Sequence, residues 1–394
     1  MPFPPLCSKG NPDVTGAQKR VLLVQPSLQP PGGGNGVAAW MLEALKRDHN
    51  VSLLSWHAPD LNAVNRFFGT SLLSSDFRLI VPSHLARAAA RCSPTPLDLL
   101  KSNHLARLGR RLAPDHDVVM SANNESDLGG NGIQYIHFPS LHPTRPEIDL
   151  RWYHPRLAVS AYRRYAQRLT GFSNERMRSN LTLVNSEWTG NLVRRLHGIE
   201  PRTVRPPVPG KFPAVPWRER EDGFVCIGRI SPEKRIELII EILAEVRSRG
   251  RPVHLHVVGT FGDRAYARRI RRLIAEHHSW VFLEENLARD ELARLVAQHR
   301  YGIHAMTEEH FGMAVAEMVR GGCIVFAPNG GGQVEIVANH RLLYDDTADA
   351  VAKVGAVLSD PDAQAELRAD LTTKAATLSA ERFVREIQEI VRGF

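Results

Sequence analysis

Residues 301–337, YGIHAMTEEHFGMAVAEMVRGGCIVFAPNGGGQVEIV, contain the pattern from which the fold of this chain is predicted. The apolar runs 301–305 and 323–327 are typical of buried strands. A helical pattern that opens at 311–312 and stops at a glycine pair separates them, and the glycines 330–332 lead into a second helix. This order predicts a parallel α/β sheet whose loops lie at the carboxyl edge of the strands, where ligands bind.

Two acids lie close to the start of the first of these helices. Glu309 is in the loop before the helix, and Glu317 lies within it. A helix that begins at Gly312 exposes N–H groups suited to phosphate oxygens, and the hydroxyls of a nucleotide sugar would satisfy both carboxylates. The alternative interpretation is a solvated loop acid and a helix-surface acid, because charged side chains are mostly exposed.

The composition is that of a soluble globular protein of two or three domains. The chain has 394 residues, of which 43% are hydrophobic and 23% are charged. No apolar run predicts a transmembrane helix, and residues 1–18 lack the apolar core of a signal peptide, so we expect them to form a disordered lead-in. The four cysteines are widely spaced without a metal-ligand pattern, which favours reduced thiols in a cytoplasmic protein.

The formal net charge of +8 is compatible with several kinds of acidic partner. Nucleic acid is disfavoured, because no zinc-finger, RRM or helix-turn-helix signature is present. Residues 151–180 are rich in Arg, Tyr and Trp and are predicted to form one long amphipathic helix with an edge. This basic helix and the pair Phe67 and Phe68 suggest contact with an anionic membrane surface or an acidic acceptor; a solvated basic face is the alternative.

The first half of the chain starts with a strand at 20–25, a Gly-rich loop and a helix at 37–47. Gly33 and Gly34 in that loop would let the backbone approach a ligand closely at the end of the strand. The loop matches neither the dinucleotide pattern nor the P-loop, and a mobile turn is the alternative. Further strands are expected at 51–56, 77–81, 118–121, 133–137 and 181–185.

His137 closes the apolar strand 133–137 at its carboxyl end. This position places the imidazole at the expected ligand-binding edge of the sheet. A hydrogen-bonded buried histidine is the alternative, and His142 nearby is a second candidate for the same role.

A Pro-rich segment at 205–217 is the best candidate for a linker. Strands and helices alternate again after it, so two similar α/β domains are predicted. We expect their bounds at 19–207 and 208–379, with a last helix at 380–394 that packs back on the first domain.

The segment 228–235, GRISPEKR, follows the first strand of the second half. Ser231 is expected to cap a helix whose first turn contains the following proline. Arg229 and Lys234 near that helix start would offer a bidentate fork and a point charge to a diphosphate. Two surface cations are the alternative, but this loop and the Glu309 loop share one sheet edge, which argues against it.

The pattern continues with a strand at 253–258, a basic helix at 261–278 and a short strand at 280–283. The loop 284–287, which ends at Leu287, then lies at a strand end. A loop in that place is suited to stack on and hydrogen-bond a nucleobase.

Together these motifs resemble the GT-B glycosyltransferases of family 4, the retaining type. The most specific part is the E-x7-E pattern from Glu309 to Glu317, and GRISPEKR is the next. The second half matches closely, and the Gly-rich loop and the YIHFP segment of the first half match in position. The sequences of these segments are most similar to those of the mannosyltransferases that extend lipid-linked oligosaccharides from GDP-mannose. The amino-terminal membrane helix of those proteins is not expected here.

The resemblance implies an α/β fold of the GT-B type, with two Rossmann-like domains facing each other across a cleft. It implies that Arg229 and Lys234 neutralise the donor diphosphate, that Glu309 accepts hydroxyls of the donor sugar and that Glu317 holds the ribose. His137 would contact the donor sugar near the reaction centre.

Further roles implied by the resemblance belong to the backbone. The N–H groups of Phe311, Gly312 and Met313 would meet the sugar or phosphate, and Gly33 and Gly34 would let the first domain close on the phosphates.

The implied reaction is the retaining transfer of a hexose from a nucleotide-diphosphate sugar to a hydroxyl of a glycan, lipid-linked or small-molecule acceptor. GDP-mannose is the favoured donor and a UDP-sugar the next. No DxD pattern or well-placed nucleophilic carboxylate is evident, so we expect a front-face mechanism without metal or cofactor. The alternatives are a non-catalytic nucleotide-sugar-binding protein and a GT-B nucleotide-sugar epimerase. The expected location is cytoplasmic, with peripheral contact at the inner membrane face.

Overall fold

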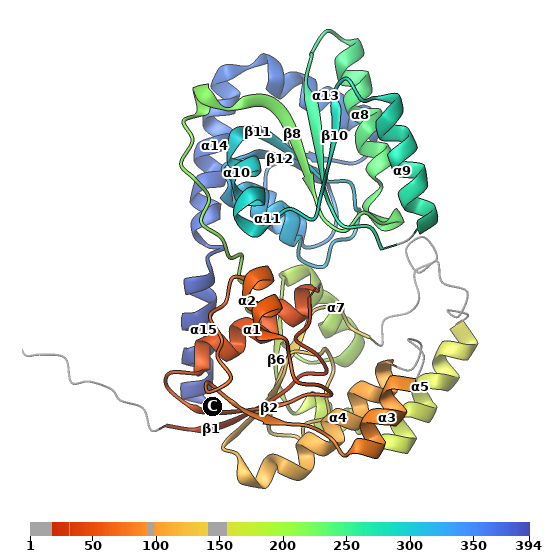
Figure 1. Cartoon of the computed structure of the whole chain (residues 1–394), viewed down its shortest axis with the longest axis vertical. Helices are drawn as coiled ribbons and strands as arrows, with labels where there is room; N and C mark the ends of the chain where they lie inside the picture. The colour runs from red at the N-terminus through yellow and green to blue at the C-terminus, as the bar shows by residue number, and fades with distance from the viewer. Residues whose placement is uncertain (1–17, 31, 93–97, 141–155, 263) are drawn as a thin grey trace, which may run out of the picture.

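Two parallel sheets, each covered by helices, organise the chain (Figure 1). The computed structural model describes residues 18–30, 32–92, 98–140, 156–262 and 264–394. Residues 1–17 of the expected lead-in, which include Cys7, and His142 lie outside these residues. No helix in the described part of the chain is long and apolar enough to cross a membrane.

The first sheet has seven parallel strands in the order β3-β2-β1-β4-β5-β6-β7. Helices cover both faces, which explains why most of its strands are runs of buried residues rather than alternating ones. The strands are β1 (Arg20–Val24), β2 (Asn50–Leu54), β3 (Arg78–Ile80), β4 (Val118–Ser121), β5 (Ile133–Ile136), β6 (Leu181–Val184) and β7 (Arg202–Thr203). The helices are α1 (Gly33–Leu45), α2 (Leu61–Phe68), α3 (His84–Cys92), α4 (Asp98–Leu112), α5 (Arg156–Thr170), α6 (Asn174–Arg178) and α7 (Glu187–His197).

The second sheet has six parallel strands in the order β10-β9-β8-β11-β12-β13. The strands are β8 (Glu221–Ile227), β9 (His254–Gly259), β10 (Val281–Glu285), β11 (His299–Ile303), β12 (Ile324–Pro328) and β13 (Leu343–Tyr344). The helices are α8 (Ile236–Ser248), α9 (Arg264–Glu276), α10 (Arg289–Gln298), α11 (Met313–Arg320), α12 (Gln333–Val337), α13 (Thr347–Ser359), α14 (Pro361–Ala376) and α15 (Ala380–Gly393).

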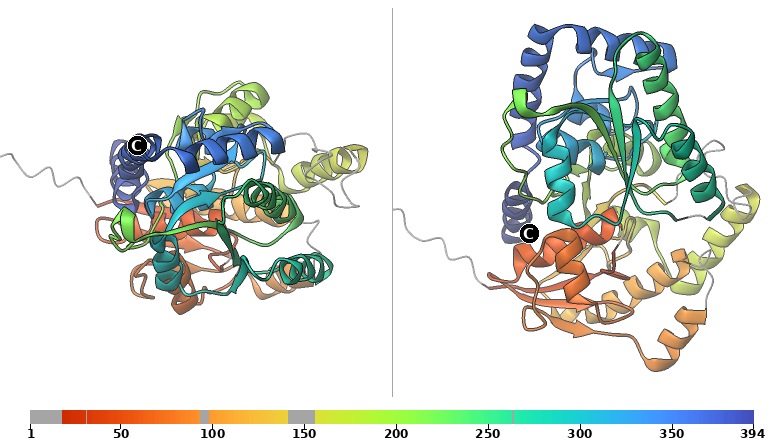
Figure 2. Two further views of the ribbon diagram at one scale, coloured as in Figure 1. Left: turned by 90° about the horizontal axis from the view of Figure 1, so that it is seen from above. Right: turned by 45° about the horizontal axis from the view of Figure 1, so that its top comes forward.

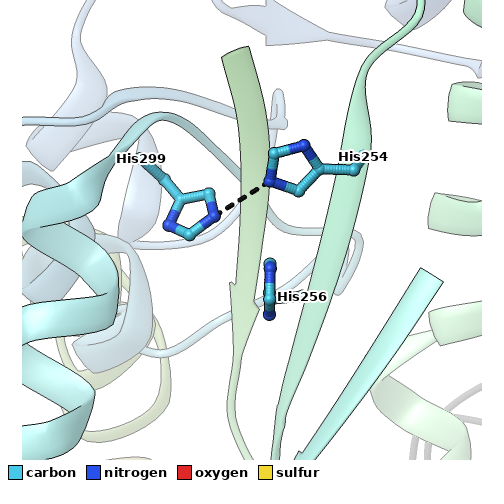
Figure 3. A group of neighbouring side chains, drawn as sticks. All are labelled: His254, His256 and His299. Carbon is cyan, nitrogen blue, oxygen red and sulfur yellow. Dashed lines mark hydrogen bonds between the residues drawn. The ribbon is translucent and has the colours of Figure 1, made fainter. Parts of the chain in front are cut away.

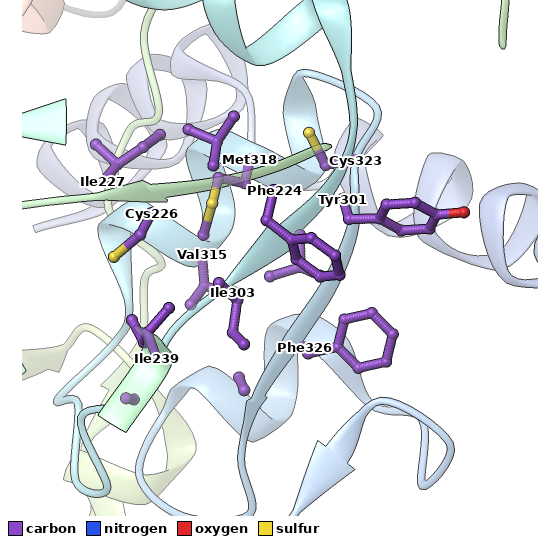
Figure 4. Packing of buried hydrophobic residues seen from close by; sticks show 14 of the residues in the cluster. Phe224, Cys226, Ile227, Ile239, Tyr301, Ile303, Val315, Met318, Cys323 and Phe326 are labelled. Atoms are coloured by element: carbon purple, nitrogen blue, oxygen red, sulfur yellow. The ribbon is translucent and has the colours of Figure 1, made fainter. Parts of the chain in front are cut away.

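An aromatic group from three neighbouring strands lies at the centre of the second domain (Figure 4). The rings of Phe224 and Tyr301 stack with their centroids 5.1 Å apart, and Phe326 lies 6.1 Å from Phe224. All three side chains are fully buried, and truncation of a buried aromatic to Ala typically costs about 3–5 kcal/mol. This core fixes the relative positions of β8, β11 and β12, whose carboxyl ends carry the loops described below.

The last helix, α15, leaves the second domain and packs on α1 of the first (Figures 1 and 2). Its apolar stripe joins the core of the first domain through Phe383, Ile387, Ile390 and Val391. The two chain segments that connect the domains also meet, because the N–H of Val208 donates to the carbonyl of Leu378 over 3.2 Å. The domains are therefore joined by two connecting segments of the chain that lie side by side.

Several expected element bounds differ from the structure. The single long helix expected within 151–180 is two helices over its described part, because Gly171 at φ 63° ends α5 before Ser173 caps α6. Residues 284–285 belong to β10 rather than to a loop. Of the two phenylalanines expected at a membrane surface, Phe67 is exposed, but Phe68 is buried against α1.

Candidate active site

Both sheets reverse their strand order at one point, between β1 and β4 in the first domain and between β8 and β11 in the second. In open parallel sheets, ligands bind outside the carboxyl ends of the strands at this reversal. The loops that follow these strands contain most of the sequence-predicted site residues.

The loop after β8 differs from its predicted form. Ser231 makes no capping hydrogen bond from its side chain; Pro232–Lys234 form a single 3-10 turn, and α8 begins only after Arg235 in the left-handed conformation at φ 50°. Gly259 allows the loop to pack on β9, since a Cβ there would lie 1.8 Å from the carbonyl oxygen of Gly228. The tight turn directs Lys234 towards the loop after β11.

Lys234 and Glu309 form an ion pair at the reversal point of the second sheet. His304, which follows β11, is buried and places its Nε2 3.0 Å from the same carboxylate oxygen. Burial alone would raise the pKa of Glu309, but the charge of Lys234 and the hydrogen bond from His304 outweigh it, so the pKa lies well below its ordinary value. Glu309 is thus an anion at neutral pH, held between a cation and a histidine.

The loop that carries Glu309 is supported by the three glycines after β12. A Cβ on Gly331 or Gly332 would lie 2.3 Å from the carbonyl oxygen of Glu309 or His310, respectively, and one on Gly330 would lie 2.5 Å from that of Thr307. The glycines are therefore needed because two backbones pack directly on each other. Gln333 also holds the loop, with Nε2 donating to the carbonyl of Met306 over 2.9 Å.

The helix after this loop, α11, begins beside the ion pair. Gly312 precedes it at φ 101°, a conformation that favours glycine, and the side chain of Phe311 is buried in the core. Only the backbone at these positions is placed to meet a ligand. The first N–H groups of a helix have no acceptor within it, so Met313 and its neighbours offer donors to an anion.

Arg229 lies apart from this cluster. Its side chain is 61% exposed, and the guanidinium is 3.5 Å from the carboxylate of Glu233 one turn later. A weak exposed pair of this kind costs little to break. Arg229 is therefore positioned at the rim of the site, from which it would have to swing to reach a diphosphate.

Glu317 is engaged on the α10 side of α11. Arg289 donates to its carboxylate over 2.9 Å and to the carbonyl of Pro209 over 2.5 Å. Glu317 therefore connects α11 to the segment that links the domains. Leu287 packs against the core of the domain with its side chain half-buried.

In the first domain, His137 and Gly34 come together. A Cβ on Gly34 would lie 3.1 Å from His137 Nε2, while the position of Gly33 is open. Both glycines lie in the first turn of α1, because this helix starts at Gly33, four residues before its expected start. The N–H groups of this turn therefore also face the reversal point of their sheet.

His137 is held in one orientation by neighbouring loops. Its Nε2 lies 2.9 Å from the carbonyl oxygen of Ala122, and Asn124 and Asn185 bond its backbone. A carbonyl only accepts, so Nε2 carries the proton and Nδ1 is left with the lone pair. Burial lowers the pKa of His137 to about 4, so the ring is neutral at physiological pH and its Nδ1 is able to accept a hydrogen bond.

The two domains contact each other through the same carboxyl-end loops. Ser186 Oγ donates to the carbonyl of His310 over 2.6 Å, and the ring of Phe138 stacks on that of His310 with centroids 4.2 Å apart. The carboxylate of Glu335 accepts the N–H of Trp188 over 2.8 Å at the start of α7. These contacts place the His137 and Glu309 loops on adjoining sides of one region.

Sequence reasoning missed several residues of this region. His304 ends a buried strand at the carboxyl edge, the signal that singled out His137, and could have been found in the same way. Arg289, Asn124 and Glu335 carry no local signal, because their roles depend on partners from distant parts of the chain. Of the predicted site residues, Lys234 and Glu309 are in direct contact at the reversal point of the second sheet, and Gly34 adjoins His137 at that of the first. Arg229, Glu317 and Leu287 lie apart from these contacts: Arg229 pairs with Glu233, Glu317 pairs with Arg289, and Leu287 follows the edge strand β10.

Lys234 and Glu309 lie beside a helix start, and each can replace its contact with the other by a contact with a ligand. A diphosphate would take Lys234 and the first N–H groups of α11, and a sugar hydroxyl would donate to the Glu309 carboxylate. The arrangement is suited to an anionic group that carries hydroxyls.

Solved structures share this two-domain architecture. Sucrose-phosphate synthase from Thermosynechococcus elongatus superposes with a TM-score of 0.70 at 17% identity, covering 95% of this chain and 99% of that one. The Anabaena protein HepE, in complex with UDP and glucose, superposes with a TM-score of 0.66 at 14% identity, covering 96% and 100%. The chain therefore has the GT-B fold, as the sequence predicted.

The second domain matches a known family model. Residues 210–377 match the model of group 1 glycosyl transferases. Among curated proteins, the chain is similar to GDP-Man:Man(3)GlcNAc(2)-PP-Dol alpha-1,2-mannosyltransferases. The protein from Dictyostelium discoideum is 30% identical over 41% of this chain and 36% of its own length, and the human protein is 29% identical over 52% and 46%. The matched region spans less than half the length of these relatives.

Proposed function

We propose that this protein is a retaining glycosyltransferase that moves a hexose from a nucleotide-diphosphate sugar to an acceptor hydroxyl. The observation that carries the proposal is the Lys234–Glu309 pair at the reversal point of the second sheet, inside a group 1 glycosyl transferase domain. A cation for the diphosphate and a carboxylate for the sugar hydroxyls lie side by side there.

Each residue has a role that its surroundings support. Lys234 and the first turn of α11 neutralise the diphosphate as it leaves, and Arg229 swings in from the rim to add a second cation. Glu309 orients the sugar through its hydroxyls, and Glu317 accepts the ribose hydroxyls once Arg289 yields. The neutral ring of His137 accepts a hydroxyl of the donor sugar through Nδ1.

Front-face substitution is the mechanism that we propose for retention. A double displacement needs a free carboxylate in the first domain, and Glu125 is a buried acid one residue after Asn124, whose side chain bonds the backbone of His137. Both of its oxygens are occupied: Oε2 accepts the N–H of Ser140 over 2.8 Å, and Oε1 lies 3.1 Å from His197 Nε2. We therefore propose that the acceptor hydroxyl attacks the face from which the diphosphate departs, without a covalent sugar intermediate. Metal independence of the donor site is a separate part of the proposal, and the EDTA in the assay below tests it.

GDP-mannose is the donor that we propose, with UDP-sugars next. The names of the curated relatives specify GDP-mannose and a lipid-linked mannosyl acceptor, and the solved HepE complex contains UDP and glucose. The similarity to the first group covers part of each relative, so the acceptor is proposed by class: a glycan, a lipid-linked glycan or a small molecule with a free hydroxyl.

Contact with an anionic membrane is part of the same proposal. Two apolar side chains of α5, Tyr165 and Leu169, are exposed beside its arginines. Such a surface binds anionic lipid headgroups electrostatically. Co-sedimentation with vesicles of phosphatidylserine and phosphatidylcholine tests it, and binding that does not exceed that to phosphatidylcholine vesicles contradicts it.

The experiment that tests the function follows the product by NMR. The protein is incubated with GDP-mannose, UDP-glucose or UDP-galactose and a panel of mannosides, with EDTA present. We expect release of nucleoside diphosphate together with a product that keeps the α configuration of its donor. An inverted product would contradict the mechanism. Conversion of the donor without an acceptor would favour the epimerase, and donor binding without any turnover would favour the non-catalytic protein.

A further inference from the structure

Three histidines converge at the amino-terminal edge of the second sheet, the edge opposite to the Lys234–Glu309 pair (Figure 3). His254 and His256 are the first and third residues of β9, so they lie on one face of the sheet. His299 is the first residue of β11. One ring nitrogen from each lies within 4.8 Å of the others, and the Nε2 atoms of His254 and His299 are 3.0 Å apart.

The convergence depends on a glycine in the strand between them. β8 separates β9 from β11, and Gly223 of β8 is paired with His254. A Cβ on Gly223 would lie 2.2 Å from His254 Nε2 and 2.4 Å from its Cε1. The backbone at Gly223 is outside the left-handed region, so the turn of the chain does not require glycine there. Because Gly223 has no side chain, the His254 ring can instead lie across β8.

The outer partners of two rings leave their Nε2 atoms ready to bind a cation. His299 Nδ1 lies 2.7 Å from the carbonyl oxygen of Leu295, and His256 Nδ1 lies 3.0 Å from the carboxylate of Glu284. Both acceptors require an N–H at Nδ1, so Nε2 has the lone pair. Metal-bound histidines usually have such an outer acceptor, which fixes their tautomer and orientation.

A carboxylate beside the three rings provides a fourth group that can bind a cation. Glu221 Oε2 lies 3.5 Å from His254 Nε2, and its side chain is 58% exposed and can move. Because Nε2 of His299 accepts, the proton between the two rings belongs to His254. A cation that binds here displaces this proton to His254 Nδ1 or to solvent.

We propose that His254, His256 and His299 bind one Zn²⁺, with the Glu221 carboxylate as fourth ligand. Zinc–nitrogen bonds of about 2.0–2.1 Å in a tetrahedron separate the ligand nitrogens by about 3.4 Å. The separations seen here run from 3.0 Å to no more than 4.8 Å, so small side-chain rotations complete the site. Within the described residues, this is the one group of three histidine, cysteine or acidic side chains with such spacing.

The ion would have a structural role. Four protein ligands leave no open position for a substrate, and the site lies at the opposite ends of the strands from the donor loops. It would tie β9 to β11 across β8. The proposal is independent of the transferase function, and either can fail without the other.

Zinc binding is measured by calorimetry on the untagged, chelator-treated full chain, with Co²⁺ absorption as a second probe. We expect one Zn²⁺ per chain and the intense visible absorption of tetrahedral Co²⁺. The variant pair His254→Gln and His256→Gln should weaken binding by at least about 100-fold, and Glu284→Gln by about 10-fold or more. The matched control His340→Gln removes an exposed histidine elsewhere in the domain and should bind as the native chain does.

Gly223→Ala provides a test that removes no ligand. Its Cβ should push the His254 ring away from His299 and reduce affinity at least about 10-fold. If this variant unfolds by circular dichroism, the two partly exposed histidine variants carry the test. Less than one bound Zn²⁺ per two native chains, or unchanged affinity in both the His254→Gln and the His256→Gln variant, would overturn the proposal.

Discussion

Replacing Glu309 with Gln should have opposite effects on nucleotide binding and on sugar transfer. In the structure the carboxylate of Glu309 contacts the ammonium of Lys234, and the diphosphate is proposed to contact the same ammonium. A phosphate oxygen in contact with Lys234 would lie about 6 Å from the carboxylate, since the ammonium bridges two contacts of about 3 Å each. The amide of Gln keeps the size of the side chain and removes its charge.

The size of the effect on binding follows from Coulomb's law. Two unit charges about 6 Å apart repel by about 2.8 kcal/mol at an effective dielectric constant of 20. The side chains of Lys234 and Glu309 are 16% and 15% exposed, so solvent screens part of this energy. We therefore expect the Kd for GDP to fall about 10-fold, which corresponds to about 1.4 kcal/mol.

Transfer should change in the other direction. Hydrogen bonds from sugar hydroxyls to a charged acceptor are worth about 1.5–3 kcal/mol, so their weakening should slow hexose transfer by about 10- to 100-fold. Calorimetry with GDP and a GDP-release assay with GDP-mannose measure the two effects. The control Glu241→Gln makes the same charge change on the exposed face of α8 and should alter neither. Weaker GDP binding by the Glu309→Gln variant would refute the placement of the diphosphate.

Three further predictions follow. Lys234→Ala should slow hexose transfer by about 10²- to 10³-fold in the GDP-release assay, and the exposed control Lys211→Ala should not; equal rates would contradict the role of Lys234. Gly332→Ala places a Cβ 2.3 Å from a carbonyl of the facing loop and should lower the Tm, whereas Gly355→Ala in open space on a helix should raise the free energy of unfolding by about 0.5–1 kcal/mol. The contribution of His137 to the stability of the folded protein should be lost as the pH falls from about 6.5 towards 4, because in that range His137 is protonated only in the unfolded chain. Thermal melts of His137→Asn should depend less on pH across that range, and an unchanged slope would count against a buried neutral ring.

Much of the fold could be predicted because buried parallel strands are continuous apolar runs with turn signals at their ends. The predicted strand 118–121 agrees with β4 residue for residue. Element ends were harder to predict. The helix start at Ser231 was wrong, because the left-handed Arg235 interrupts a segment whose local preferences favour one helix.

The individual site residues were found as separate signals, but their partnerships were not. Nothing near Glu309 indicates that its carboxylate pairs with Lys234, since these residues lie in loops that follow different strands and meet only through the sheet order. The histidine cluster was missed for the same reason. His254 and His256 have the alternate spacing of one strand face, but His299 and Gly223 join them only across the sheet.

The central claim is that the second domain holds a nucleoside diphosphate at Lys234 and the start of α11. Calorimetric titration of the native chain with GDP, UDP and ADP, with EDTA present throughout, tests it most directly. The account predicts that one of these nucleotides binds with a stoichiometry of one per chain and that Lys234→Ala weakens this binding by at least about 10-fold. Failure of all three to bind the folded native chain, or equal affinity in the variant, would contradict it.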